Sequence, residues 1–407
     1  MEFGKGKRYM NFYGFPRPDG SVGVRNFIGI IPTVDCCNEM VVNVASKVPG
    51  GIALPHIGRC VYLGKDQDRL YQLLTGLGKN PNLAGVVVIG TGCEPTSAEK
   101  IGQEISNSGK PVEVVTLKKA GNYQNTIQQG VEKTRLLVKK IQSQNREKYS
   151  LKYLNLSIKC GGSDTTSAIA SNMISGMIAD QVIDEGGTVF FTETPELIGA
   201  ENVLAKRAAN KKVSEKIFRA VAKQEKRMLA MGVDVRKCEP TPGNIQGGLT
   251  TIEEKSLGAI IKSGTKILQD VLESGQRPKG KGLYFIDGPS HTTEIYSNVA
   301  AAGAQVLLFS IGGGLPAKLP LNPACSGTFP LMPIIKMSGN PKGYLGAESN
   351  MDIYVGTIIE GKENYQEAKE KALKTLISII SGRAVSISEN FTKYYEPMNF
   401  YFEGPLI

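Results

Sequence analysis

Short apolar runs that are rich in β-branched residues alternate along this chain with longer stretches of helical character. The run at 85–90, Gly-Val-Val-Val-Ile-Gly, contains no polar side chain, which is typical of a strand buried on both faces. Similar runs occur at 27–34, 52–54, 112–117, 154–158, 188–192, 282–286 and 305–310. Helices that separate such strands cover the two faces of a parallel sheet. The sequence therefore predicts an α/β fold with two Rossmann-like parallel-sheet units and helices on both faces.

The charged run 139–148 divides these strands into two groups and predicts a domain boundary. We expect a first α/β domain over 12–148, a second α/β domain with the catalytic loops over 149–407, and a leader or tail over 1–11. The leader is basic but lacks the apolar core of a signal peptide. No apolar run reaches the roughly 18 to 20 residues that a membrane span requires. The expected location is the cytoplasm, with no membrane partner.

The net charge of +10 limits the classes of partner. Basic residues are scattered among acidic ones, and the chain has neither a nucleic-acid-binding motif nor a basic stripe with aromatic residues. Nucleic acid is therefore not an expected partner. Solubility is the simplest interpretation of the charge, and an anionic small-molecule substrate is the next. The glycine clusters also lack the spacing of nucleotide-binding loops.

Four of the seven cysteines share one context. Cys36, Cys60, Cys93 and Cys160 each follow a predicted strand and lie near a glycine or a turn. The carboxyl ends of neighbouring parallel strands meet at one crevice, and thiolates bind iron, zinc or iron–sulfur clusters. His56 lies four residues before Cys60 and either joins this set as a ligand or has a structural role. The alternative is simple packing, because a free cysteine behaves as a small apolar residue.

The other three cysteines carry weaker signals. Cys37 is expected to pack in the core, and Cys238 has no clear role. Cys325 lies in a glycine- and proline-rich loop at 312–330, where it is either a further ligand or has no function.

Three side chains are candidates for proton transfer. His291 follows the strand at 282–286 and is the second of only two histidines. Glu193 follows the strand at 188–192 and forms a carboxylate pair with Glu196, although both could simply cap a helix. Lys255 follows a run of turn-forming residues, where a mobile ammonium can bind an anion.

Several motifs occur together in an order that resembles the altronate/galactarate dehydratase family. They lie at 14–26, 32–36, 89–94, 159–164, 241–244, 247–249 and 351–356, so the resemblance extends from about residue 12 to residue 385. The resemblance implies an iron-dependent hydro-lyase, which removes the proton next to the carboxylate of a sugar acid and expels the β-hydroxyl. The product would be a 2-keto-3-deoxy acid. The same family includes the large subunit of sulfolactate sulfo-lyase, which expels sulfite.

The resemblance also implies roles for individual residues. Iron, as Fe2+ or as an iron–sulfur cluster, would be held by a set of five: Cys36, His56, Cys60, Cys93 and Cys160. The base would be His291, Glu193 or Lys255. The anionic substrate would be bound by residues in or near the same motifs: Arg25, Ser163, Asp164, Asn244 and Lys262.

The chain departs from the family pattern in two respects. Sugar-acid dehydratases of this kind carry an extra small N-terminal domain, and this chain has no room for it, so we expect a small SAF-type partner subunit as well as a homo-oligomer. The loop that ends at Pro330 is also longer than the turn expected there. Two alternatives therefore stay open, namely the large subunit of a sulfolactate sulfo-lyase and a non-catalytic iron-binding scaffold subunit.

Overall fold

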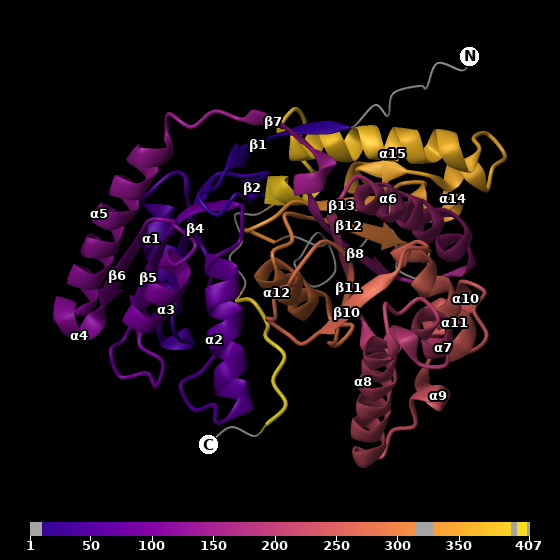
Figure 1. Ribbon diagram of the computed structural model, residues 1–407, viewed down its shortest axis with the longest axis horizontal. Helices are drawn as coiled ribbons and strands as arrows, with labels where there is room; N and C mark the ends of the chain where they lie inside the picture. The colour runs from indigo at the N-terminus through magenta and orange to yellow at the C-terminus, as the bar shows by residue number, and fades with distance from the viewer. Residues whose placement is uncertain (1–9, 314–328, 392–396, 405–407) are drawn as a thin grey trace.

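The computed structural model describes residues 10–313, 329–391 and 397–404. Two parallel β-sheets with helices on their faces make up most of the molecule (Figure 1), which confirms the predicted α/β class. In the described part of the chain, the smaller sheet has the strand order β4-β3-β5-β6 and the larger sheet has the order β10-β11-β9-β8-β12-β13-β14. All the strand pairs in these two sheets are parallel.

The smaller sheet lies between two pairs of helices. Its strands are β3 (Phe27–Pro32), β4 (Gly51–Ala53), β5 (Leu83–Gly90) and β6 (Val112–Thr116). Helices α1 (Asn38–Ser46) and α5 (Tyr123–Ile141) share one apolar cluster with this sheet, and α2 (Lys65–Gly78) and α3 (Ala98–Ser106) share another. Every residue of β5 is buried, which explains why its sequence contains no polar side chain.

The larger sheet holds the second group of strands. They are β8 (Asn155–Gly161), β9 (Thr188–Phe191), β10 (Leu268–Leu272), β11 (Gly282–Ile286), β12 (Val306–Ile311), β13 (Ile334–Ser338) and β14 (Ile353–Tyr354). Helices α6 (Asn172–Asp184), α8 (Lys211–Ala230) and α15 (Tyr365–Ile380) belong to its principal apolar cluster. On the other face, α12 (Thr292–Ala302) packs against α2, so the two sheets share an apolar core.

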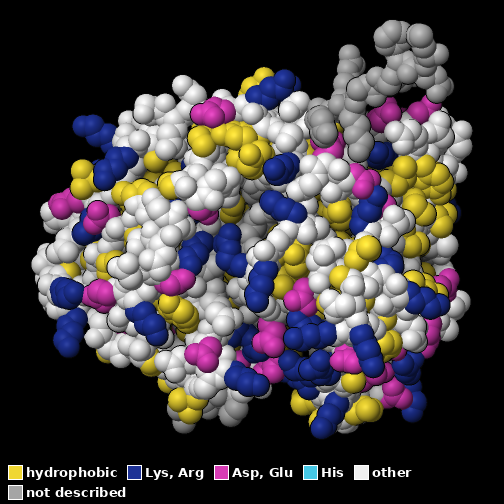
Figure 2. Space-filling model, in the orientation of Figure 1, with side chains coloured by type: hydrophobic (Ala, Val, Ile, Leu, Met, Phe, Trp, Pro, Cys, Tyr) yellow, Lys and Arg dark blue, Asp and Glu magenta, His cyan; other side chains and the backbone are white. Residues whose placement is uncertain are grey.

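The other described α-helices, from both halves of the fold, are short. They are α4 (Leu117–Ala120), α7 (Glu201–Ala205), α9 (Val235–Cys238), α10 (Pro242–Gln246), α11 (Ile252–Ile260) and α14 (Pro341–Tyr344). No described helix combines the length and the apolar character that crossing a membrane requires. On the face drawn in Figure 2, Lys and Arg side chains are interspersed with Asp and Glu, as the sequence indicated.

A third, antiparallel sheet differs from the expectation. None of the predicted strands begins before residue 27, but the structure has β1 (Asn11–Pro16) and β2 (Val22–Gly23) there. Strand β1 also pairs with β7 (Glu147–Ser150), whose first two residues belong to the charged run that predicted a boundary. The pairing joins Asn11 to Ser150. A contact between residues so far apart in the sequence leaves no local signal, and glycine and proline weaken the strand pattern.

The segment 397–404, here called the C-terminal strap, runs beside α2 (Figure 1). Figure 1 shows it in yellow between α2 and α8. Met398 pairs with His56, in the loop after β4, and the side chain of the next residue, Asn399, donates a hydrogen bond of 2.7 Å to Thr293 Oγ1, beyond β11. The carboxyl edges of the two sheets are therefore close together, since two consecutive strap residues contact both of them.

Candidate functional site

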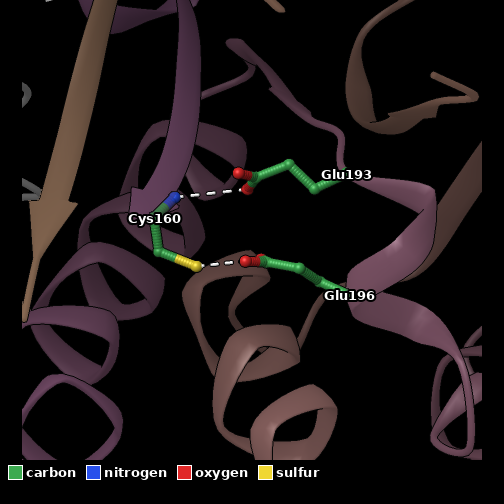
Figure 3. A group of neighbouring side chains, drawn as sticks. All are labelled: Cys160, Glu193 and Glu196. Atoms are coloured by element: carbon green, nitrogen blue, oxygen red, sulfur yellow. Dashed lines mark hydrogen bonds between the residues drawn. The ribbon is translucent and has the colours of Figure 1, made fainter. Parts of the chain in front are cut away.

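A buried cysteine and two buried glutamates meet at the carboxyl edge of the larger sheet. Cys160 lies at the end of β8, and the segment that follows β9 directs Glu193 and Glu196 toward it (Figure 3). The backbone N–H of Cys160 donates to Glu193 Oε2 at 3.2 Å, and Cys160 Sγ donates to Glu196 Oε2 at 3.0 Å. The three ligand atoms lie within 4.8 Å of one another, so this group could hold a metal ion.

The ammonium of Lys262 already lies among these three side chains. Its Nζ is 3.0 Å from Cys160 Sγ, 2.8 Å from Glu193 Oε2 and 2.7 Å from Glu196 Oε2. A second ammonium, that of Lys159, lies 3.7 Å from Glu193 Oε1. Two lysines therefore balance two carboxylates in a buried network. A metal ion bound to this group would have to displace Lys262.

Burial and the neighbouring charges together give the members of this network different pKa values. Burial by itself raises the pKa of Glu196, but the ammonium of Lys262 outweighs it and lowers that pKa to about 2. Burial, reinforced by the charge of Glu196, raises the pKa of Glu193. Burial also raises the pKa of the Cys160 thiol. Glu196 is thus the permanent counter-ion, while Glu193 is the carboxylate poised to take up or release a proton.

The backbone at Glu193 is strained. Its φ of 86° lies in the left-handed region, and among the described residues it is the one non-glycine residue with a positive φ. Such a conformation costs about 1–3 kcal/mol and tends to occur at functional sites. The turn is held because Thr194 donates its N–H to Gly288 O at 3.0 Å and its hydroxyl to Asp287 Oδ1 at 2.6 Å. This turn aims the Glu193 carboxylate at Cys160.

The other two candidate bases lie at the margin of the network. Lys255 bonds Glu239 Oε2 at 2.6 Å, and the charges of Glu196, Glu239 and Cys160 outweigh burial and raise its pKa. His291 is exposed and directly precedes α12, with Nδ1 3.0 Å from Thr293 Oγ1. Of the three candidates, Glu193 is the one at the centre of the buried group.

Three of the predicted substrate-binding residues make hydrogen bonds within the loops beside β8. The side chain of Asn244 donates to Ser163 O at 2.8 Å and accepts the hydroxyl of Thr241 at 2.8 Å. The Asp164 carboxylate accepts N–H groups from Ser167 at 2.6 Å and from Gly313 at 2.8 Å. The side chains of Asp164 and Asn244 and the backbone of Ser163 therefore help to fix the loops beside β8.

The other two predicted substrate-binding residues, Arg25 and Lys262, form ion pairs within the fold. Arg25 donates from Nε and Nη2 to Glu389 at 2.5 and 2.7 Å, and from Nη1 to Val24 O at 2.7 Å. Its donors are thus engaged in holding the fold together. Lys262 was expected to bind substrate, but it lies inside the buried network. Lys159 was not singled out by sequence reasoning, although a lysine inside an apolar strand was an available signal.

The five predicted metal ligands do not gather at one point in the described structure, where Cys160, Glu193 and Glu196 form the one group within ligand distance. Cys36, Cys60 and Cys93 are exposed and belong to the smaller sheet, whereas Cys160 belongs to the larger one. Burial and Asp35 raise the pKa of Cys36, and nearby Cys60 adds to the effect. Cys325 lies outside the described residues.

His56 is committed to the fold. It is fully buried, its Nδ1 accepts the N–H of Gly58 at 3.0 Å, and its Nε2 lies 2.8 Å from Pro32 O. Because the carbonyl can only accept, Nε2 carries the proton and neither ring nitrogen has a lone pair free for a metal ion. Phe400 of the C-terminal strap stacks on the ring at 5.0 Å. His56 therefore positions the loop that leads to Cys60.

This buried histidine predicts a loss of stability in acid. Burial lowers the pKa of His56 from 6.5 to about 4, so the unfolded chain binds the proton first as the pH falls. Stability should be intact above pH 6.5 and decline between 6.5 and 4, by about 3 kcal/mol from this residue. Urea unfolding of wild type and His56→Gln at several pH values measures the effect. Parallel pH profiles for the two proteins would contradict it.

Two family models match the chain. Residues 151–401 match the model described as D-galactarate/Altronate dehydratase, C-terminal, and residues 14–142 match that described as D-galactarate dehydratase/Altronate hydrolase, second domain.

Individual relatives agree with these matches. The chain is 36% identical over 375 residues to the (2R)-sulfolactate sulfo-lyase subunit beta of Chromohalobacter salexigens. The alignment covers 91% of this chain and 93% of the relative. The chain is 31% identical to the altronate dehydratase of Bacillus subtilis, with 93% of this chain and 76% of the relative covered. For the galactarate dehydratase (L-threo-forming) of Escherichia coli the identity is 29%, with 93% and 74% covered. The chain therefore belongs to the D-galactarate/altronate dehydratase family.

Proposed function

We propose that this chain is an iron-dependent hydro-lyase that removes water from a hydroxylated sugar acid, of the altronate or galactarate kind, to give a 2-keto-3-deoxy acid. The observation that carries the proposal is the network at the end of β8, in a chain of this family. There the carboxyl group of Glu193, which has a raised pKa, is held on a strained turn between Lys159 and Lys262. Perturbed, buried carboxylates of this kind are what a general base requires.

The network suits removal of a proton next to a carboxylate. Glu193 is the base, because a carboxylate shielded from water is more basic than an exposed one. Negative charge develops on the oxygen atoms of the substrate as the proton leaves. Lys159 and Lys262 place positive charge next to the base in a site with little water, where electrostatic stabilisation is strongest. Glu196 remains ionised and keeps Lys262 in position.

Iron, when bound, would supply a Lewis acid that polarises the substrate carboxylate and the departing hydroxyl. We assign it to the exposed thiols Cys36, Cys60 and Cys93, at the carboxyl edge of the smaller sheet. Thiolate is a ligand that iron accepts as a single ion or in an iron–sulfur cluster. Cys160 is the less favourable position, because Lys262 already compensates the two carboxylates next to it.

Serine variants test the metal assignment. Cys36→Ser, Cys60→Ser and Cys93→Ser should each lose most of the bound iron after anaerobic purification, because a serine hydroxyl is a poor substitute for a thiolate. Cys160→Ser should keep it, and Cys238→Ser, an exposed cysteine elsewhere, serves as the matched control. Iron and acid-labile sulfide per chain are measured. Full iron in the first three variants would refute the assignment, and loss in Cys160→Ser would move the ion to Cys160, Glu193 and Glu196.

A second candidate function is that of a sulfolactate sulfo-lyase subunit. It is favoured by sequence identity, since the chain is 36% identical to the sulfo-lyase subunit and 31% identical to the altronate dehydratase. Both reactions begin with the same proton removal, so the network fits either. Release of sulfite from sulfolactate, compared with release of a 2-keto acid from altronate or galactarate, separates them.

We also propose a small SAF-type partner subunit and a homo-oligomeric assembly. The partner is supported by the word subunit in the name of the sulfo-lyase relative. A chain that binds iron but turns over only when a partner is added would support a split enzyme. A chain that binds iron and stays inactive with every partner tested would instead be a scaffold subunit.

A further inference from the structure

The hydroxyl group of Tyr296 is buried without a hydrogen-bond partner among the described residues. The side chain is fully buried within the apolar core shared by the two sheets. Its hydroxyl has no partner, although nearly all buried polar groups in folded proteins have one. Leaving such a group unpaired destabilises the fold. The hydroxyl therefore requires a partner that the described residues do not supply.

The position of Tyr296 points to the buried network. The residue lies in α12 one turn beyond Thr292, and long side chains in a helix point back toward its N-terminus. The hydroxyl is therefore directed over the first turn of α12, where Thr292 Oγ1 accepts a hydrogen bond of 3.3 Å from Lys159 Nζ. Burial, and then the charge of nearby Glu193, raise the pKa of Tyr296, so its hydroxyl is a donor.

Two further observations describe the surroundings of this hydroxyl. Ser290 Oγ, which lies two residues before α12 begins, is also buried and without a partner in the described structure. The ring of Tyr296 packs against Phe329 at 5.8 Å, and the ammonium of Lys159 lies 4.2 Å from the centre of the Phe309 ring. The ammonium of Lys159, through its bond to Thr292, and the hydroxyl of Ser290 thus lie at the N-terminal end of α12, one turn before Tyr296.

We propose that Tyr296 contacts the substrate, a polyhydroxylated carboxylate, and that its hydroxyl donates a hydrogen bond to one of the substrate oxygen atoms. The ammonium of Lys159 attracts the negatively charged carboxylate group of the same substrate. Ser290 provides the second hydroxyl of this subsite. The inference rests on the proposed function and adds a determinant of specificity to it. A site that forms a hydrogen bond to a substrate oxygen rejects analogues without that oxygen, because the buried hydroxyl of the protein is then left unpaired.

The variant Tyr296→Phe tests this role because it removes only the hydroxyl. We expect at least a tenfold increase in Kd and in KM for the best of three probes, altronate, galactarate and sulfolactate. The melting temperature should stay the same or rise, since an unpaired buried hydroxyl is lost. The matched control is Tyr284→Phe, because Tyr284 is a buried tyrosine of the same apolar cluster, in β11. The control should leave Kd unchanged.

Ser290→Ala provides an independent test and should weaken binding of the same probe. The inference is overturned if Tyr296→Phe binds and turns over every probe as wild type does, or if the iron-loaded wild type binds none of them. If a probe binds in a Tyr296-dependent manner but loses neither water nor sulfite, the subsite stands and the hydro-lyase assignment fails. The two proposals are thus distinguishable.

Discussion

Glu193→Gln is expected to lower kcat by about 10²- to 10⁴-fold with little change in KM, the range for loss of a general base. Glutamine keeps the shape of the side chain and can still accept hydrogen bonds from Cys160 N and Lys262 Nζ. It cannot take up a proton. The measurement is steady-state turnover of the best substrate by the iron-loaded protein, together with its melting temperature. Glu113→Gln, which removes a carboxylate paired with Lys133 at 2.5 Å in the smaller sheet, is the control.

The pH profile gives this prediction a second readout. A base acts in its ionised form, so kcat/KM should rise with pH through the pKa of Glu193. That pKa is raised, so the acid limb should lie above 4.5, the ordinary value for a glutamate. The limb should disappear from the residual activity of Glu193→Gln. A variant with full activity and an unchanged limb would exclude Glu193 and return the role of base to His291 or Lys255.

The sequence predicted the strands where burial leaves a local trace. Strands buried on both faces have no polar alternation, and the apolar runs at 85–90, 154–158 and 282–286 correspond to β5, β8 and β11. Strand β1 is only half buried, and its partners β2 and β7 are short, so no such run marks them. Pairing of β1 with β7 depends on contacts between residues more than 130 positions apart, which no local pattern encodes.

The site was predicted in its parts but not in its assembly. Cys160, Glu193 and Lys262 were each selected, but as a ligand, a base and a substrate-binding residue. Their contacts follow from the adjacency of β8 and β9 and from the short helical turn that follows α11, which are properties of the tertiary fold. The convergence of strand ends holds within one sheet. That rule says nothing about where Cys160 lies relative to Cys93, because β8 and β5 lie in different sheets.

Lys262→Met is expected to destabilise the fold by about 3–5 kcal/mol, as is found when one partner of a buried ion pair is removed. The ammonium is buried and contacts both Glu193 and Glu196. Its loss leaves the two carboxylates with weaker compensation, from Lys159 at 3.7 Å from Glu193 and from the charge of Lys255 near Glu196. Urea unfolding at pH 7 measures the change. Lys266→Met breaks an exposed pair with Asp184 and should change stability by no more than about 1 kcal/mol.

The pH dependence of this variant separates a charge effect from a cavity effect. In wild type, Lys262 lowers the pKa of Glu196 to about 2, so the stabilisation from Glu196 is present above pH 4.5 and is lost as the pH falls toward 2. Without Lys262, the pKa of Glu196 should be higher than in wild type, because burial remains while the largest opposing charge is gone. Protonation of Glu196 then relieves the variant as the pH falls. The stability difference between the two proteins should therefore narrow from pH 7 to pH 4.

Adding Glu196→Gln to Lys262→Met should recover part of the loss of stability at pH 7. A constant difference at all pH values, with no recovery in the double variant, would mean that Lys262 acts by filling space and that charge balance does not hold the network together.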